Sequence, residues 1–180
     1  MSSLEGLRFE QETDPGARAA HRRFERVVAE APGRGAWACE AGCNFCCHLL
    51  VTVTPSEAAV LVGRLTPEAI ARVEDRARRA AGLTPGEYPR ARNPCAVLDA
   101  DGCCSAYDAR PLKCRAHTST SREICERVHC GEATTNEVPM DSWLVRAADA
   151  IRHGMAEEEE ELHAALLRVV TPGPAGASNR

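Results

Sequence analysis

Apolar positions near the start of the chain follow the periodicity of a helix. Between Ala17 and Ala31 they recur on one helical face, at Ala20, Phe24, Val27, Val28 and Ala31. Pro32 and Gly33 follow directly, and both residue types end helices. The pattern therefore predicts a helix over residues 17–31.

Two capping signals predict further helices. The segment Thr54-Pro55-Ser56-Glu57 offers an N-cap threonine, a proline at the first helical position and a glutamate that can complete a capping box. We expect this helix to run to about Arg64. Thr66 and Pro67 begin a similar amphipathic stretch that Gly82 closes. Its charged residues should form a solvated face.

The C-terminal third also has a helical pattern. Asp141-Ser142-Trp143 is a capped start, and the apolar positions after it predict one long helix or two. Five consecutive glutamates, residues 157–161, are expected to be solvated and to repel one another. Residues 169–180 are predicted to be a disordered tail because Pro, Gly and Ser dominate its end.

Composition favours a mostly α fold. Apolar residues make up 44% of the chain but aromatic residues only 4%, so Ala, Val and Leu must build the core. Residues 83–113 are rich in turn signals and are predicted to be loops. We divide the chain into a polar segment with one helix (1–34), a cysteine-cluster domain (35–132), a helical region packing on it (133–168) and the tail (169–180).

Charge and hydropathy exclude several classes of partner. The net charge is −4, and no stretch has the surplus of Lys and Arg that neutralises a phosphate backbone, so we expect no nucleic acid partner. The start of the chain has no basic segment followed by an apolar run, and no eighteen consecutive residues are apolar. We therefore expect a cytoplasmic protein with no membrane partner.

The ten cysteines carry the chemistry of this sequence. All of them lie between Cys39 and Cys130. A reducing cytosol disfavours structural disulfides but leaves thiolates free to bind metal. The clustering therefore indicates a metal site rather than a disulfide framework.

The first group of cysteines is Cys39, Cys43, Cys46 and Cys47, with spacings of four, three and one. If this segment were helical, the four thiolates would share one face and repel one another unless Zn or Fe neutralised them. A stripe of buried apolar cysteines is the alternative. The vicinal pair Cys46-Cys47 is difficult to place on one ion, which favours two metals or a bridging thiolate.

A second group follows in the turn-rich segment. It comprises Cys95, Cys103, Cys104 and Cys114, on loops that can fold over the first group and complete its coordination. Together the two groups resemble the CxxCxxCC (YkgJ-like) cysteine-cluster family, described as candidate zinc- or iron-chelating domains. The resemblance covers about half of the chain, roughly Ala38 to Cys125.

The resemblance rests on two motifs in the expected order. The later motif falls on Cys95, Leu98, Gly102, Cys104, Ser105, Tyr107, Arg110, Pro111, Cys114 and Arg115. Two departures are Ala96, which replaces a proline, and the gap of three residues between Cys39 and Cys43 instead of two. Cys125 is similar to a late family cysteine, whereas Cys103 stands where another residue is usual.

The predicted metal ligands are eight thiolates. They are Cys39, Cys43, Cys46, Cys47, Cys95, Cys104, Cys114 and Cys125. Other donors are held in reserve: Cys103, Cys130, His48, His117 and His129. Arg110 and Arg115 either offset the negative charge of the site or pair with a loop acid such as Asp108. Tyr107 is expected to pack in the core with a tethered hydroxyl.

These residues predict a protein that binds metal ions, its expected partners. One or two zinc ions are the first choice of cofactor, because tetrahedral thiolate sites suit zinc, and iron is the alternative. Two other functions stay open: an iron–sulfur redox protein and a thiol–disulfide switch. Filled thiolate coordination leaves no open position, so we assign no enzymatic activity. A metal with an open position that binds substrate is a further alternative.

Overall fold

A computed structural model of the chain describes residues 16–80, 83–84, 87–91 and 93–171. The fold is mostly α, as predicted, with one small two-stranded sheet. The α-helices are α1 (Ala17–Glu30), α2 (Pro55–Val62), α3 (Pro67–Ala80), α4 (Tyr88–Ala91), α5 (Leu112–Ala116), α6 (Arg122–Cys130), α7 (Ser142–His153) and α8 (Leu162–Val170). The strands are β1 (Thr52–Val53) and β2 (Glu160–Glu161). The 3-10 helices are η2 (Arg34–Ala36), η3 (Phe45–His48), η4 (Tyr107–Ala109) and η5 (Thr135–Glu137).

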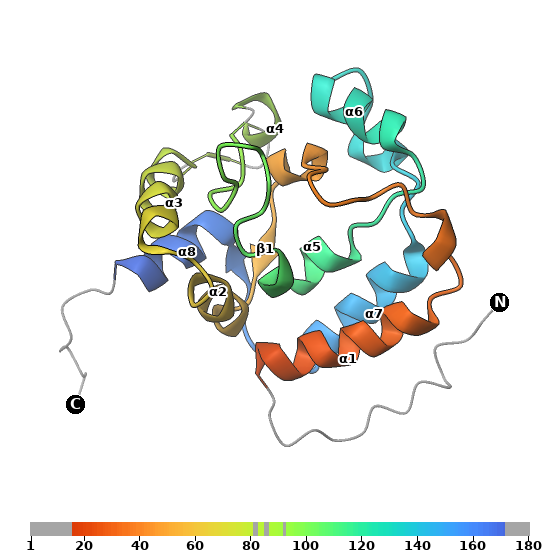
Figure 1. Ribbon diagram of the computed structural model, residues 1–180, viewed down its shortest axis with the longest axis horizontal. Coiled ribbons are helices and arrows are strands. Elements are labelled where there is room, and N and C mark those ends of the chain that lie inside the picture. Colours follow the sequence, from red (N-terminus) through yellow and green to blue (C-terminus); the bar gives the residue numbers. More distant parts are fainter. Residues whose placement is uncertain (1–15, 81–82, 85–86, 92, 172–180) are drawn as a thin grey trace.

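One hydrophobic core lies between α1, α5 and α7. Figure 1 shows α1 and α7 side by side, with α5 packed against α7. The largest side chains of this core are Phe24, Val27, Leu112, Leu144 and Ile151. These apolar positions come from helices far apart in the sequence, so this core packs the first helix of the chain against α7.

A second core lies between α2, α3 and α8. It includes Leu61, Val73 and Leu166, together with Val97 from the turn-rich segment. The strands β1 and β2 pair antiparallel beside it, with Thr52 opposite Glu161. Parts of the cysteine-bearing segments pack against these cores: Trp37, two residues before Cys39, packs against the first core, and Cys95 and Cys104 pack against the second.

The predicted starts of α1, α2 and α3 are confirmed. Thr54 forms the capping box: its side chain accepts a hydrogen bond from the Glu57 amide, and the Glu57 side chain accepts one from the Thr54 amide. The third helix begins at Pro67, while its predicted end at Gly82 lies outside the described residues.

The C-terminal pattern forms two helices rather than one. Asp141 caps α7 by accepting hydrogen bonds from the amides of Trp143 and Leu144, as its position predicted. α8 is separate and continues to Val170, so the predicted start of the tail at residue 169 is wrong: Val169 and Val170 extend the apolar pattern of the helix. Positions 172–180 of the predicted tail lie outside the described residues.

The expectation of a purely solvated, repelling glutamate run is wrong. Glu157 accepts hydrogen bonds from the amide and the hydroxyl of Ser56, and Glu159 pairs with Lys113 and Arg152. Glu161 caps α8 through the Ala164 amide. Pairing of β2 with β1 brings these carboxylates beside donors distant in sequence, and the donors offset their repulsion.

Three α-helices were not predicted: α4, α5 and α6. α5 begins at Leu112, inside the expected loop over residues 83–113. α4 interrupts the expected loop over residues 83–113, and Glu87, three residues after Thr84, accepts hydrogen bonds from the Thr84 amide and hydroxyl at its start. α6 is capped by Ser121 and ends at Gly131, which adopts the left-handed conformation with φ of 80°. At α4 and α6, residue types typical of turns cap the ends of a short helix. For this reason the sequence pattern did not reveal a helix at either place. None of the helices in the described part of the chain combines the length and the apolar character needed to cross a membrane.

Candidate metal centre

The first cysteine segment is an irregular loop and not the helix considered above. Gly42 has a φ of 86°, and the Cys43 amide donates to the Glu40 carbonyl oxygen at 3.1 Å, closing a tight turn. η3 then holds Cys46 and Cys47 in adjacent positions. A left-handed residue cannot continue a right-handed helix, so Gly42 separates Cys39 from the other three cysteines of the run.

Cys39 is held by the segment that precedes α6. The Ala38 amide donates to the Ser119 carbonyl oxygen at 2.8 Å, and the Ser119 amide lies 3.3 Å from the Cys39 sulfur. Trp37 Nε1 donates to Asp141 Oδ2 at 3.1 Å and ties this loop to the start of α7. The first loop is therefore fixed from the C-terminal half of the domain.

The second cysteine segment contains a tight turn. The Asp99 amide donates to the Cys103 carbonyl oxygen at 2.8 Å, and Asp99 Oδ1 accepts hydrogen bonds from the Asp101 and Cys103 amides. Gly102 occupies the left-handed region with φ of 75°. This turn places Cys103 and Cys104 together at its end.

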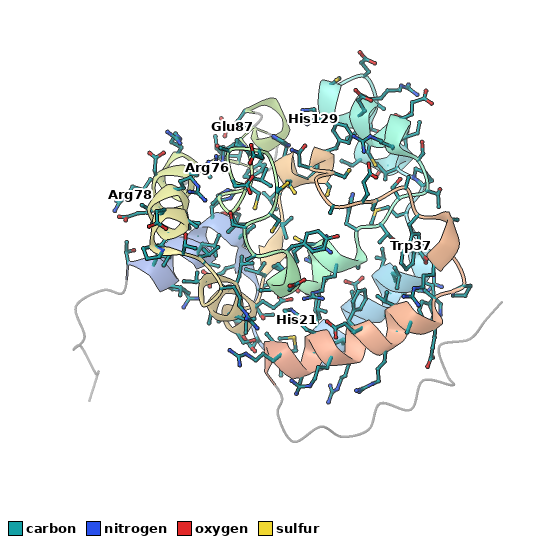
Figure 2. The ribbon with its side chains drawn as sticks, viewed as in Figure 1. His21, Trp37, Arg76, Arg78, Glu87 and His129 are labelled. Atoms are coloured by element: carbon teal, nitrogen blue, oxygen red, sulfur yellow. The ribbon has the colours of Figure 1, made fainter. Side chains whose placement is uncertain are left out.

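The two cysteine segments dock through backbone hydrogen bonds. The Cys95 amide donates to the Cys47 carbonyl oxygen at 2.7 Å, and Asn44 Nδ2 donates to the Gly102 carbonyl oxygen at 3.1 Å. Arg76 of α3, labelled in Figure 2, donates to the carbonyl oxygens of Cys95 and Leu98 from the other side. This arginine was expected on a solvated face; its neighbours Arg78 and Arg79 do form exposed ion pairs within α3.

A buried carboxylate fixes the helix that carries Cys114. Glu57 is 0% exposed, and besides closing the α2 cap it accepts a hydrogen bond from the Leu112 amide at 2.7 Å. Leu112 is the first residue of α5, where the amides lack helical partners. One side chain therefore caps two helices and sets the position of Cys114.

Six of the eight predicted ligands line one cavity. Its volume is about 300 Å³, and the six are Cys43, Cys46, Cys47, Cys95, Cys104 and Cys114. A second cavity of about 390 Å³ is lined by Cys39 and again by Cys114. Cys125 lies on α6 and lines neither cavity.

Burial and mutual repulsion keep several of these thiols protonated. Burial raises the pKa of Cys95 and of Cys114 to about 12, and neighbouring thiols add to both shifts. A hydrogen bond with Cys47, followed by burial, raises the pKa of Cys46. Burial also raises the pKa values of Cys39 and Cys104. Such thiols become thiolates readily only when a cation offsets their charge.

Mutual effects on pKa link the thiols in two overlapping sets, both of which contain Cys46. The pKa of Cys39 is raised, after burial, by Cys43, Cys46 and Cys125. The pKa of Cys95 is raised, again after burial, by Cys114, Cys104 and Cys46. We call Cys39, Cys43, Cys46, Cys47 and Cys125 the first thiol group, and Cys95, Cys104 and Cys114 the second thiol group.

The thiols are near one another without yet enclosing an ion. Within the described residues, no three His, Cys, Asp or Glu side chains converge closely enough to hold a metal in this arrangement. The ten cysteines, all within the described residues, form no disulfide bond there. The soft sulfur donors still fit zinc or iron chemically, since the same donor set forms tetrahedral sites for both.

Two arginines shape the loop between Cys104 and Cys114. The Arg110 guanidinium lies 3.6 Å from the centre of the Tyr107 ring and lowers the pKa values of nearby Cys104 and Cys114, against the effect of burial. Arg115 donates to the Arg110 and Asp108 carbonyl oxygens, and its carboxylate partner is Glu25 at 3.4 Å. The side chain of Tyr107 is 44% exposed, so its predicted core position is wrong.

The reserve donors differ in their positions relative to the cysteine cavities. Cys103 and Cys130 are exposed. His48 and His129 form an edge-to-face pair with ring centres 4.5 Å apart, and His117 lines both cavities. His163 also lines the cavity that contains the six cysteines. This residue lies outside both cysteine motifs, and the sequence did not single it out.

The fold and the site together define a small, mostly helical protein built around clustered cysteines. A family model matches residues 38–138, more than half of the chain. The chain therefore belongs to the CxxCxxCC family, described as a candidate zinc- or iron-chelating domain. Zinc or iron chelation is accordingly the function that the family indicates. Searches of curated proteins and of solved structures gave no match.

Proposed function

We propose that this protein chelates two metal ions, zinc in the first place, through the eight predicted thiolates. The observation that carries the proposal is the docking of the two cysteine segments, in which the Cys95 amide donates to the Cys47 carbonyl oxygen at 2.7 Å. That bond supports a centre assembled from both motifs, because it joins their backbones beside the cavity that six cysteines line.

Each thiol group receives one ion in this proposal. The first group offers five thiolates, more than one tetrahedral ion needs, and the second offers three, one fewer than it needs. The vicinal pair Cys46-Cys47 belongs to the first group, but Cys46 also acts on Cys95 of the second, and adjacent residues of one chain are poorly placed to bind one ion together. Two ions accommodate this arrangement better than one.

Metal binding has to draw the thiols inward and release their protons. Thiolates are the ligand form of cysteine, so each ion replaces bound protons and supplies the positive charge that the buried sulfurs lack. Zinc is preferred because four thiolates satisfy its tetrahedral geometry without redox chemistry, and iron uses the same donors. The proposed role is structural chelation in the reducing cytoplasm, with no enzymatic step assigned.

Counting reactive thiols tests this function against its alternatives. In protein purified anaerobically without a tag, we expect a chelator to increase the number of thiols that react, and a reductant alone to leave it unchanged. Thiols that appear only after reduction would contradict the proposal and support a disulfide switch. If the anaerobic protein absorbs visible light, and acid abolishes this absorption and releases sulfide, the cofactor is an iron–sulfur cluster and not zinc.

A further inference from the structure

One buried histidine lies beside the second thiol group with an unused ring nitrogen. His163, on the first turn of α8, is 1% exposed. Its Nδ1 lies 2.7 Å from Glu161 Oε1 and 2.8 Å from the Tyr88 hydroxyl oxygen. Its Nε2 is also buried but has no hydrogen-bond partner among the described residues. A buried polar atom without a partner costs about 1–3 kcal/mol, so a ligand bound to this nitrogen would stabilise the arrangement.

The partners of Nδ1 set the chemistry of Nε2. A carboxylate only accepts hydrogen bonds, so Glu161 favours the form of His163 that carries its proton on Nδ1. Nε2 of a neutral ring then presents a lone pair. Metal-binding histidines are commonly oriented in this way, with one ring nitrogen donating to a carboxylate and the other bound to the ion.

The cavity connects this histidine to the cysteines. His163 lines the cavity of about 300 Å³ together with all three cysteines of the second thiol group. Leu162, the residue before it, belongs to the core against which Cys95 and Cys104 pack. Tyr88, the other partner of Nδ1, lies within electrostatic range of Cys95, which helps to raise the pKa of its hydroxyl after burial and Glu161.

We propose that His163 Nε2 is the fourth donor to the ion held by Cys95, Cys104 and Cys114. This inference rests on the proposed function and completes its second site as three thiolates and one imidazole, an established zinc coordination set. Glu161 and Tyr88 act as positioning residues for the ring. The donor comes from α8, outside residues 38–138 that match the family, so the C-terminal region takes part in the metal centre.

X-ray absorption at the zinc edge tests this assignment on the metal-loaded full chain. We expect the wild-type protein to show a nitrogen shell beside the dominant sulfur shell, and His163→Gln to lose the nitrogen contribution. In that variant the affinity for one of the two zinc equivalents should fall at least about 10- to 100-fold, since loss of a mere supporting partner of a ligand already costs that much. Circular dichroism of His163→Gln establishes that the variant is folded.

Matched variants separate a ligand from a structural histidine. His21 is another buried histidine whose Nε2 lacks a partner among the described residues, but it lines neither cysteine cavity. His21→Gln should keep the nitrogen shell, and Tyr88→Phe, which removes only a partner of Nδ1, should keep it as well. His48→Gln tests the nearest histidine of the first loop and is expected to keep it too.

Several results would overturn the assignment. A wild-type zinc spectrum with sulfur alone, a nitrogen shell that persists in His163→Gln, or one that disappears in His48→Gln would each do so. If Cys47→Ser rather than His163→Gln weakens the second equivalent, Cys47 is the fourth donor. These outcomes leave zinc binding intact, whereas failure of the wild-type protein to bind metal would refute the proposed function instead.

Discussion

At the scale of single residues, contacts between side chains far apart in the sequence set the surroundings of the thiols. Cys43 and Cys125, from segments far apart in the sequence, both help to raise the pKa of Cys39 after burial. Glu57 and His163 act through contacts with residues far along the chain. No local pattern encodes such contacts, although the capping box at Thr54 did predict the first role of Glu57.

Serine substitutions test the division between ligands and reserves. Cys95→Ser and Cys114→Ser should each remove about one of two bound metal equivalents, because serine is a poor ligand for soft metals. Elemental analysis with protein quantification measures the change. Cys103→Ser and Cys130→Ser are the controls and should retain both equivalents; a larger loss in the controls than in Cys95→Ser would refute the assignment.

At the scale of elements, caps and turns explain which helices the sequence revealed. α2 and α7 begin at side chains that cap them directly, so both starts were predictable. The loop that carries Cys39 and Cys43 was harder to predict, because its cysteine spacing suits a helix while Gly42 breaks it. The segment over residues 157–161 became β2 and a set of ion pairs only through its pairing with β1.

Glu57 should be among the most sensitive polar positions. Glu57→Gln replaces one carboxylate oxygen with an NH2 group, which would face the amide of Thr54 or of Leu112. Two donors cannot bond to each other, so we expect a loss of about 2–3 kcal/mol in the free energy of unfolding. Urea unfolding measures this loss. Glu68→Gln, in the first turn of α3 but exposed to solvent, should change it by less than about 0.5 kcal/mol. Equal effects at both positions would contradict the double cap.

Gly102 should be required for docking of the second cysteine turn. An added Cβ would clash with Asn44 Nδ2, and the φ of 75° at this position is strained for any residue with a side chain. Gly102→Ala is therefore expected to lower the free energy of unfolding by about 1–3 kcal/mol. It should also weaken metal binding, because the turn carries Cys104. Gly35→Ala is the control, since nothing lies within 4 Å of its added Cβ. Unchanged stability and metal affinity in Gly102→Ala would show that the two loops dock differently.

At the scale of the whole molecule, two hydrophobic cores hold the cysteine loops between them. The cavity that six cysteines line is also lined by Val145 and Ala148 of α7 and by Leu61 of α2 and Leu162 of α8. A mostly α fold with this composition was predictable. The arrangement of two cores around the centre was not, since it depends on packing between helices distant in sequence.

His21 gives the stability of the molecule a dependence on pH. Burial, together with the nearby charge of Arg115, lowers its pKa from 6.5 to about 4. The unfolded state therefore binds the proton more tightly, and stability is fully present above pH 6.5 and falls as the pH drops towards 4. The contribution of this residue has a slope of at most about 1.4 kcal/mol per pH unit.

The difference between the wild-type protein and His21→Gln isolates that effect, because loss of metal at low pH affects both proteins. Figure 2 marks His21 on α1, in a different element from the cysteine loops. We expect the free energies of unfolding of the two proteins to converge as the pH falls from 6.5 to 4. Parallel curves over this range would show that His21 is protonated equally in the folded and unfolded states.

Chelation of metal by the clustered thiolates is the central claim, and elemental analysis of the anaerobically purified, untagged protein tests it most directly. We expect about two equivalents of zinc, or of iron in its place, per chain, because eight thiolates and one imidazole suffice for two four-coordinate ions. Less than about half an equivalent of any transition metal would contradict the claim, since a centre that couples to folding should retain its ions through purification.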